Sequence, residues 1–524
     1  MLVLCSMQDL ARRRRMVMLI LKAGTQVMIP GGAKVRDMVL ILSFDGANGR
    51  SVARKLRAER VFCKIVPADI APDAVKEQEP LGIILAGGSQ GSLSLPGFHA
   101  ELLDLGLPLL ALGDAAAAVC AALGGQAADS FLEQTAATVT YQAELPLFEE
   151  VPEGERMMTF VRPLELSEGL SPAAWSSDAV IGFVQQEKKL YGLQFQVEQN
   201  DPDGIQILAN FALKVCGCTA WWDSSAFIAR AVDEVRRVAG EGGVLCAISG
   251  GVDSGVCAML GHKAVGARMK CVFVDTGLMR KGESEYVLAF YRDVLGLKVE
   301  KVDAADRFLR ELSGIVEPQR KKRVISRLLQ DILTAEAGKN PDAAVILQGT
   351  NYSDSPDGMG ADSRISMNDR YRQAVLVEPV KELFKDEIRR VGEELGMPPE
   401  IYTRQPFPGA GLALRIMGDV TAQRLTILRE ADAIFLEEIA ASGQGKRLWK
   451  HFAVLSDLGE HGMNGIAICL RAVHASESST AMAARLPSDL LERVSMRILK
   501  ALPQVVRVLY DLTPGYNFAG IEWQ

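Results

Sequence analysis

A short glycine-rich segment is the part of the chain whose residue types most directly suggest chemistry. It follows the apolar run 244–248 and opens the helix-like stretch 255–260. A turn between a strand and a helix presents backbone N–H groups and the positive end of the helix dipole to an anion. The segment therefore predicts a phosphate or pyrophosphate site, made by Ser249, Gly250, Gly251, Val252, Asp253, Ser254 and Gly255.

This segment differs from two common nucleotide-binding motifs. It has neither the Gly-x-x-x-x-Gly-Lys-Ser/Thr pattern of P-loop proteins nor the Gly-x-Gly-x-x-Gly pattern of dinucleotide folds. It resembles the SGGxDS loop of the ATP-pyrophosphatases, which cleave ATP to AMP and pyrophosphate while adenylating a carbonyl oxygen. An ordinary turn between strand and helix can also contain such glycines, so the assignment depends on the rest of the chain.

Further motifs follow this loop in a fixed order. Residues 271–278 (CVFVDTGL) read as the next parallel strand and its turn. The others lie at 348–350 (QGT), 378–379 (EP), 382–387 (ELFKDE), 406–415 (PFPGAGLALR), 486–493 (LPSDLLER), 507–513 (RVLYDLT) and 521–523 (IEW). Together they resemble the GMP synthase family, from about Met38 to Gln524. The resemblance implies synthesis of GMP from XMP, ATP and an ammonia released from glutamine.

The resemblance also implies an α/β fold in several domains. We expect a flavodoxin-like class I glutamine amidotransferase domain at 38–222, an ATP-pyrophosphatase domain of the adenine-nucleotide α-hydrolase-like fold at 223–405, and a small α+β domain for dimerisation and acceptor binding at 406–524. Residues 1–37 stand apart as an N-terminal extension. Four arginines and a short apolar run there resemble a signal peptide, but no clean cleavage site follows. A disordered extension or a misplaced start codon is favoured over export.

The composition indicates a multidomain cytoplasmic enzyme. A chain of 524 residues is too long for one hydrophobic core. Its net charge of -7 gives no general attraction to nucleic acid, and no segment after the extension has the roughly 18 uninterrupted apolar residues of a membrane span. Cys246, Cys257 and Cys271 lie in apolar runs, which indicates buried thiols in a reducing compartment. Cys216 and Cys218 lack a second ligand pair, so no zinc site is expected.

Residues 38–222 have the pattern of a buried sheet but lack the residues of a glutaminase. Candidate strands lie at 39–42, 82–85, 107–112 and 190–195, and residues 86–89 occupy the place of the family's oxyanion-hole turn. Class I amidotransferases use a cysteine nucleophile, a histidine base and a glutamate. The corresponding positions here read Gly113, Gln196 and Glu198.

No other residue is expected to replace the missing cysteine and histidine. Cys120 lies seven residues after Gly113, about two helical turns away, and reads as a small apolar residue on the inner face of its helix. None of the five histidines lies between positions 100 and 261. We therefore expect an intact fold without glutaminase activity, which could stabilise the synthetase half or bind a regulator. Ammonia would come from solution or from a separate glutaminase.

In the synthetase half, the resemblance assigns ATP to the glycine-rich loop and Lys385 to the pyrophosphate. Magnesium and cations are expected where negative charge develops on the leaving pyrophosphate. Asp253 is expected either to bind Mg²⁺ or to cap the helix. A solvated lysine on a helix is the alternative for Lys385.

The acceptor site departs from the family pattern. Lys322 stands where the family has an arginine for the nucleotide substrate, although the run 320–323 also reads as a solvated helix face. The family's Lys-Ser-His-His-Asn loop is replaced by a segment that contains Arg364 and Arg370, and the C-terminal tail keeps Glu522 but loses a lysine. The alternatives are therefore an ammonia-using GMP synthase, a relative that aminates a different oxo-heterocycle, and a pseudoenzyme that regulates a true GMP synthase. The resemblance implies a homodimer.

Overall fold

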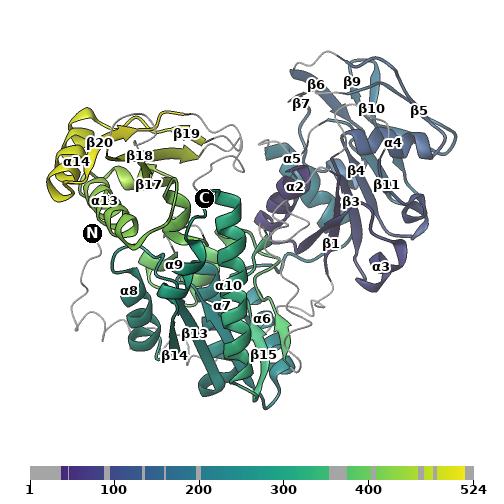
Figure 1. Ribbon diagram of the computed structural model, residues 1–524. Helices are drawn as coiled ribbons and strands as arrows, with labels where there is room; N and C mark the ends of the chain where they lie inside the picture. The colour runs from purple at the N-terminus through teal and green to yellow at the C-terminus, as the bar shows by residue number, and fades with distance from the viewer. Residues whose placement is uncertain are drawn as a thin grey trace. The chain divides into compact units, whose positions relative to one another are not determined.

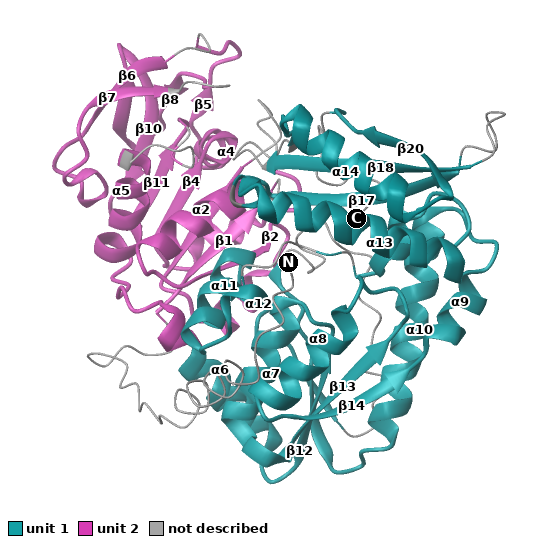
Figure 2. Cartoon of the chain, turned by 90° about the vertical axis from the view of Figure 1, so that its left-hand side faces the viewer, with its two compact units in different colours: residues 1–25, 228–354, 362–524 teal, residues 26–227, 355–361 magenta. Residues whose placement is uncertain are grey.

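The computed structural model describes residues 37–44, 47–87, 95–132, 136–157, 161–195, 197, 202–352, 374–402, 407, 409–457, 465–475 and 481–513. The predicted N-terminal extension therefore lies almost wholly outside the described residues. The chain divides into two compact units (Figure 2), of which one holds the described residues up to Phe227 and the other those from Ile228 onward. The domain boundaries inferred from the sequence stay predictions.

The first unit is built on a nine-stranded mixed sheet with the strand order β2-β1-β3-β4-β11-β10-β9-β6-β7. The parallel part comprises β1 (Val39–Ser43), β2 (Cys63–Pro67), β3 (Gly82–Ala86), β4 (Leu109–Leu112) and β11 (Leu190–Leu193). The antiparallel part comprises β6 (Ala136–Tyr141), β7 (Gly154–Met157), β9 (Ser171–Ser176) and β10 (Ala179–Gln185). The four strands predicted from apolar runs are β1, β3, β4 and β11. They form because continuous apolar segments suit strands that are covered on both faces.

Short elements complete this unit (Figure 1). The helices are α2 (Ala47–Ala58), α3 (Pro72–Glu77), α4 (Asp114–Ala122) and α5 (Pro202–Asn210), and β5 (Gln126–Ala127) pairs with β8 (Leu164–Glu165) in a second sheet. Helix α4 directly follows β4, so the turn between them lies at the carboxyl end of a buried parallel strand. Ligands of open α/β sheets commonly bind at such ends.

The boundary between the units falls within helix α6 (Ser224–Ala239), and the second unit contains a five-stranded parallel sheet, ordered β14-β13-β12-β15-β16. Its strands are β12 (Gly243–Ile248), β13 (Met269–Asp275), β14 (Lys298–Asp303), β15 (Ala343–Leu347) and β16 (Val375–Val377). The helices are α7 (Val252–Val265), α8 (Glu283–Ala289), α9 (Ala305–Leu312), α10 (Pro318–Gly338), α11 (Lys385–Glu394) and α12 (Pro399–Tyr402). Helix α7 packs on β12 and α10 packs on β13 (Figure 1). Both sheets confirm the predicted α/β fold class.

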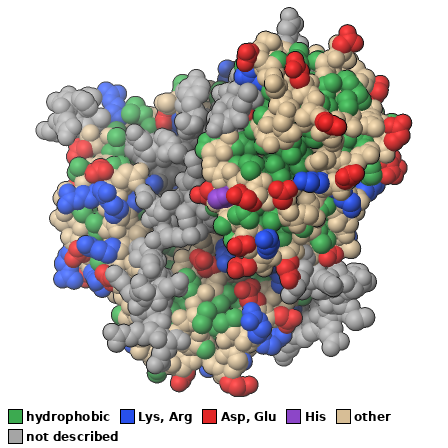
Figure 3. Space-filling view, turned by 90° about the vertical axis from the view of Figure 1, so that its right-hand side faces the viewer, with side chains coloured by type: hydrophobic (Ala, Val, Ile, Leu, Met, Phe, Trp, Pro, Cys, Tyr) green, Lys and Arg blue, Asp and Glu red, His purple; other side chains and the backbone are tan. Residues whose placement is uncertain are grey.

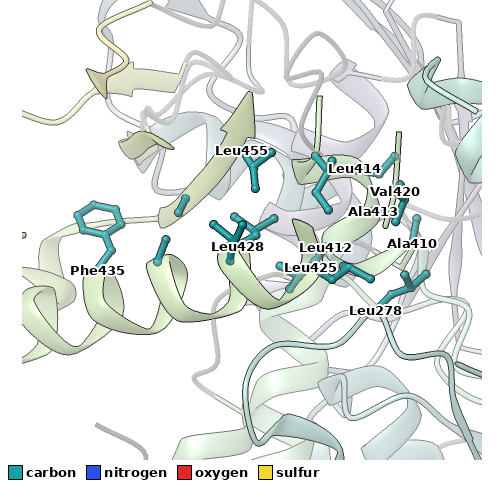
Figure 4. Close-up of a cluster of buried hydrophobic side chains, with 14 of the residues drawn as sticks. Leu278, Ala410, Leu412, Ala413, Leu414, Val420, Leu425, Leu428, Phe435 and Leu455 are labelled. Carbon is teal, nitrogen blue, oxygen red and sulfur yellow. The ribbon is translucent and has the colours of Figure 1, made fainter. Parts of the chain in front are cut away.

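The last described part of this unit is a four-stranded sheet with two long helices. It comprises β17 (Lys450–Asp457), β18 (Ile466–Ala475), β19 (Ala481–Ala483), β20 (Val505–Tyr510), α13 (Ala422–Ala441) and α14 (Ser488–Ala501). A short 3-10 helix, η9 (Gly411–Arg415), leads into it and is entirely buried. Its Leu412 packs with Leu278, Leu428 and Leu455 in one apolar cluster (Figure 4). The core of the parallel sheet therefore continues into the C-terminal part of the chain.

The described part of the surface mixes charged and apolar side chains. On the face drawn in Figure 3, described side chains of both charge signs lie among scattered apolar ones. Among the helices in the described part of the chain, none is both long and apolar enough to cross a membrane.

Candidate functional site

The predicted phosphate loop lies between the end of β12 and the start of α7. Gly250 has a φ of 80°, a left-handed conformation that favours glycine. The hydroxyl of Ser254 joins the two ends of the loop, because its Oγ accepts the Ser249 N–H at 3.1 Å and donates to the Gly251 carbonyl at 3.2 Å. The two serine hydroxyls are also 3.1 Å apart. The loop is thus held in one shape before any ligand binds.

Two other sequence motifs pack against this loop. Gly349 of the QGT motif follows β15, and a Cβ atom there would come within 2.8 Å of the Ser254 nitrogen. The next residue, Thr350, donates from Oγ1 to Glu378 Oε1 at 2.5 Å, which joins the QGT motif to the motif at 378–379. The first turn of α7 has N–H groups without helical partners, as every helix start does. The turn therefore offers donors to an anion beside a tightly packed support.

Asp253 and Lys385, which lie 132 residues apart in sequence, meet at this loop. Lys385 is the first residue of α11, and its Nζ donates to Asp253 Oδ2 in an ion pair. Asn351 Nδ2 also donates to Oδ2, at 3.3 Å. The other oxygen, Asp253 Oδ1, is buried and has no hydrogen-bond partner among the described residues. Gly251 is the N-cap of α7 and Asp253 lies inside the helix, so the capping role considered for Asp253 is wrong.

One residue of the basic run at 320–323 is buried, which the sequence did not predict. Lys321 is 1% exposed, and its Nζ donates to the carbonyls of Ala413, Ile416 and Gly418 at 3.2, 2.7 and 2.7 Å. Burial lowers the pKa of Lys321 to about 8. The predicted acceptor residue Lys322 is half-buried on α10, and the first and last residues of the run, Arg320 and Arg323, are exposed. The run is therefore a structural anchor as well as a charged surface.

A cavity of about 400 Å³ lies near this anchor. Its lining residues are Asp419, Thr421, Gln423, Arg424, Asp457, Gly465 and Ile466. Gly418, which accepts from Lys321, directly precedes the first of them. Arg424 forms an ion pair with Asp457 and donates to the Asp419 carbonyl at 3.1 Å. The predicted acceptor residues Arg364, Arg370 and Glu522 lie outside the described residues.

In the first unit, Gly113 occupies a sharp turn between β4 and α4. Its φ of 62° and ψ of -131° are unusual for residues with side chains, and its N–H donates to the Leu193 carbonyl at 2.9 Å. Such a strained turn is typical of a nucleophile elbow. A Cβ atom on Gly113 would meet none of the described atoms within 4 Å. The turn therefore has space for a side chain, but glycine provides no nucleophile.

Cys120, the nearest cysteine, lies in a different environment. Its side chain is fully buried in α4, as predicted, and burial raises the pKa of its thiol to about 11. A buried thiol with a high pKa is a poor nucleophile. Gln196 and Glu198, the other two glutaminase positions, lie outside the described residues.

Comparison with known proteins identifies the family. The model of the GMP synthase C-terminal domain matches residues 437–523. The "GMP synthase [glutamine-hydrolyzing]" of Caldicellulosiruptor saccharolyticus is 38% identical over 511 residues, which cover 93% of this chain and 99% of that protein. The protein of the same name from Clostridium acetobutylicum is 37% identical over 510 residues, 93% of this chain and all of that one.

The chain also shows a weak similarity to one solved structure, that of a Thermoplasma acidophilum protein described as a GMP synthase subunit. The two sequences are 24% identical, and the TM-score is 0.31. The match covers 34% of this chain and 94% of that chain. The relatedness therefore rests on the sequence matches, which extend over nearly the whole chain. The chain belongs to the GMP synthase family.

Proposed function

We propose that this chain is an ATP-dependent ligase that aminates XMP to GMP through an adenylated intermediate and draws on free ammonia. The meeting of Asp253 and Lys385 at the glycine-rich loop carries the proposal. Residues that come from two distant motifs converge on one anion-binding turn. A pyrophosphate group with its counter-charges suits such an arrangement.

The proposed reaction has two steps. The acceptor's carbonyl oxygen attacks the α-phosphorus of ATP, and the bond to the bridging oxygen of the pyrophosphate breaks. Ammonia then attacks the activated carbon, and AMP leaves with the former carbonyl oxygen while a proton is lost. The N–H groups in the first turn of α7 hold the β- and γ-phosphates, and Lys385 stabilises the charge that develops on the pyrophosphate.

The donor set at the loop fits Mg²⁺. Magnesium in ATP sites is held by one or two carboxylates, by phosphate oxygens and by waters. Asp253 Oδ1 is a buried carboxylate oxygen without a partner among the described residues, so it is the group that would hold the ion. The ion would neutralise charge on the departing pyrophosphate. Among the described residues, no group of three or more acidic, histidine or cysteine side chains could hold a metal ion. The ion would therefore need phosphate oxygens and waters as its other ligands.

The acceptor site is proposed near α10, with Lys322, Arg364, Arg370 and Glu522 as its contacts. The neighbouring cavity has the carboxylates of Asp419 and Asp457 in its lining, of which Asp457 is paired with Arg424. Negative charge there disfavours the phosphate of XMP unless the two arginines compensate. A different oxo-heterocycle with less negative charge is therefore the alternative acceptor.

Two residues of the first unit support a proposal on the nitrogen source. Gly113 provides an elbow with the backbone of a catalytic turn and no nucleophile, and the sequence has glutamine at the base position, Gln196. A carboxamide cannot accept and return a proton as imidazole does. We propose that glutamine is not hydrolysed and that ammonia arrives from solution or from a separate glutaminase.

We further propose that the chain forms a homodimer through its C-terminal part. Large apolar side chains are exposed there on and next to β19, α14 and β20, namely Met482, Met496, Leu499, Val506, Leu509 and Leu512. Exposed apolar surface of this kind is typical of a protein interface. Sedimentation of the chain at several concentrations measures this directly.

The test of function is product release from ATP, Mg²⁺ and ammonium with XMP and other oxo-purine nucleotides as acceptors. We expect AMP and pyrophosphate in equal amounts, with aminated product. Binding of MgATP without AMP release for any acceptor would favour the pseudoenzyme instead. Absence of MgATP binding would remove the ligase proposal altogether.

A further inference from the structure

One arginine of helix α13 holds the loop that follows strand β13. Arg429 Nε donates to the Met279 carbonyl at 2.9 Å, and its Nη2 donates to the Gly277 carbonyl. Between these two residues, Leu278 packs against Leu412 in the apolar cluster of Figure 4, and its carbonyl accepts the Leu412 N–H at 2.7 Å. Because the arginine contacts two backbone oxygens, it fixes the course of the main chain rather than that of a side chain.

Two ion pairs attach the rest of this loop to the same helix. Arg280 Nε lies 3.0 Å from Asp432 Oδ2, and both side chains are almost fully buried. Lys281 Nζ lies 2.6 Å from Glu430 Oε2, but this pair is exposed and contributes little. Both acidic residues lie within three positions of Arg429. The loop at 277–281 is therefore held by α13 along nearly its whole length.

This loop leaves the sheet beside the glycine-rich loop. Strand β13 is the parallel neighbour of β12, and Phe273 is paired with Ile248. Since parallel strands point the same way, the segments that follow them leave the same edge of the sheet. Ligands of open α/β sheets bind outside the carboxyl ends of the strands. The loop at 277–281 is therefore placed beside the proposed ATP site.

The first turns of α13 lie at a second place of interest, the cavity of about 400 Å³ that neighbours the proposed acceptor site. Gln423 and Arg424 are among its lining residues. Arg429 follows Arg424 by five positions, which is about 7.5 Å along a helix. One continuous helix of 20 residues therefore contacts both the cavity and the loop beside the ATP site.

We propose that Arg429 is a positioning residue that sets the distance between the acceptor and the α-phosphate of ATP. Adenylation requires the acceptor's carbonyl oxygen to reach the α-phosphorus, and a misplacement of about 1 Å can lower the rate about 100-fold. Arg429 keeps the two sites in register through α13. This inference rests on the proposed function, because it takes ATP and an oxo-heterocycle as the two substrates.

The proposal predicts that Arg429→Gln affects the rate rather than binding. Each substrate keeps its own contacts while their alignment is lost, so kcat should fall about 10- to 100-fold. The Kd for MgATP, measured by titration calorimetry, and the KM for the acceptor should stay within about twofold. Arg429→Lys should recover only part of kcat, because one ammonium cannot donate to two carbonyls as the planar guanidinium does.

Arg497→Gln is the matched control. Arg497 lies on α14 and pairs with Glu437 and Glu438 of the same helix α13, so its loss removes comparable contacts that do not involve the loop. We expect this variant to keep the kcat of the wild type. Thermal unfolding of all variants checks the fold, and Arg429→Lys replaces Arg429→Gln in every comparison if the latter does not fold.

Two results would overturn the inference while the proposed function stands. One is a kcat for Arg429→Gln within twofold of the wild type. The other is a loss of MgATP binding that equals the loss of kcat, because Arg429 would then support the ATP site alone. A wild-type chain that releases no AMP with any acceptor would instead remove the proposed function, and this inference with it.

Discussion

Gly251 offers a way to block the glycine-rich loop without disturbing the fold. Its backbone has φ -78° and ψ 159°, which other residues adopt readily. A Cβ atom there would contact Ser249 Oγ at 3.4 Å, the one neighbour within 4 Å among the described atoms. Gly250 and Gly349 differ, because the first has a positive φ and a side chain on the second would strike the backbone of Ser254. Gly251→Val should therefore fold normally.

The same substitution should weaken MgATP binding strongly. A valine side chain on the loop keeps phosphate oxygens away from the backbone donors. Loss of one charge-assisted hydrogen bond typically costs about 1.5–3 kcal/mol. This corresponds to about a 10- to 150-fold increase in Kd.

Titration calorimetry with ATP and Mg²⁺ measures this change, and thermal unfolding without nucleotide checks the fold. Gly445→Val is a matched control, because Gly445 has a negative or extended φ and a Cβ atom there would meet, of the described atoms, only Ile439, at 3.6 Å. A Gly251→Val protein that unfolds like the wild type and binds MgATP within twofold would refute the assignment of the loop to pyrophosphate.

Three further predictions concern single side chains. Lys385→Gln should lower kcat by about 100- to 1000-fold, as for other groups that stabilise transition-state charge, and a change in KM alone would contradict that role. Lys321→Met should lower the free energy of unfolding, and by more at pH 9.5 than at pH 7.5. The pKa of Lys321 is about 8 in the folded chain against 10.5 for the free side chain, so folding releases a proton and stability rises between these values. Urea unfolding at the two pH values tests this, and an equal loss at both would contradict it. Gly113→Cys should fold with some loss of stability, because the elbow has room for a side chain but its φ of 62° strains any residue other than glycine. It should release no glutamate from glutamine unless Gln196→His is added. Glutamate release by the single variant, measured with a coupled glutamate assay, would show that another base acts.

The sheets and the phosphate loop could be predicted from the sequence because their signals are local. Apolar runs predicted strands at 39–42 and 244–248, and the structure has them at Val39–Ser43 and Gly243–Ile248. Parallel strands that are covered on both faces are built from continuous apolar runs. The sequence indicates a helix from 255, whereas α7 begins at Val252, because composition does not show where the first helical hydrogen bond forms.

The missed features depend on contacts between distant residues. Four consecutive basic residues give no sign of which one points inward, and the carbonyls that receive Lys321 lie 92 to 97 residues later.

The most direct test compares nitrogen donors in the amination of XMP. Purified chain is incubated with XMP, ATP and Mg²⁺, and GMP is measured with either ammonium or glutamine as the donor. The proposed function predicts GMP and an equal amount of AMP with ammonium, and no GMP above background with glutamine. Glutamine-dependent GMP formation by the purified chain would contradict the central claim that this family member has lost its glutaminase.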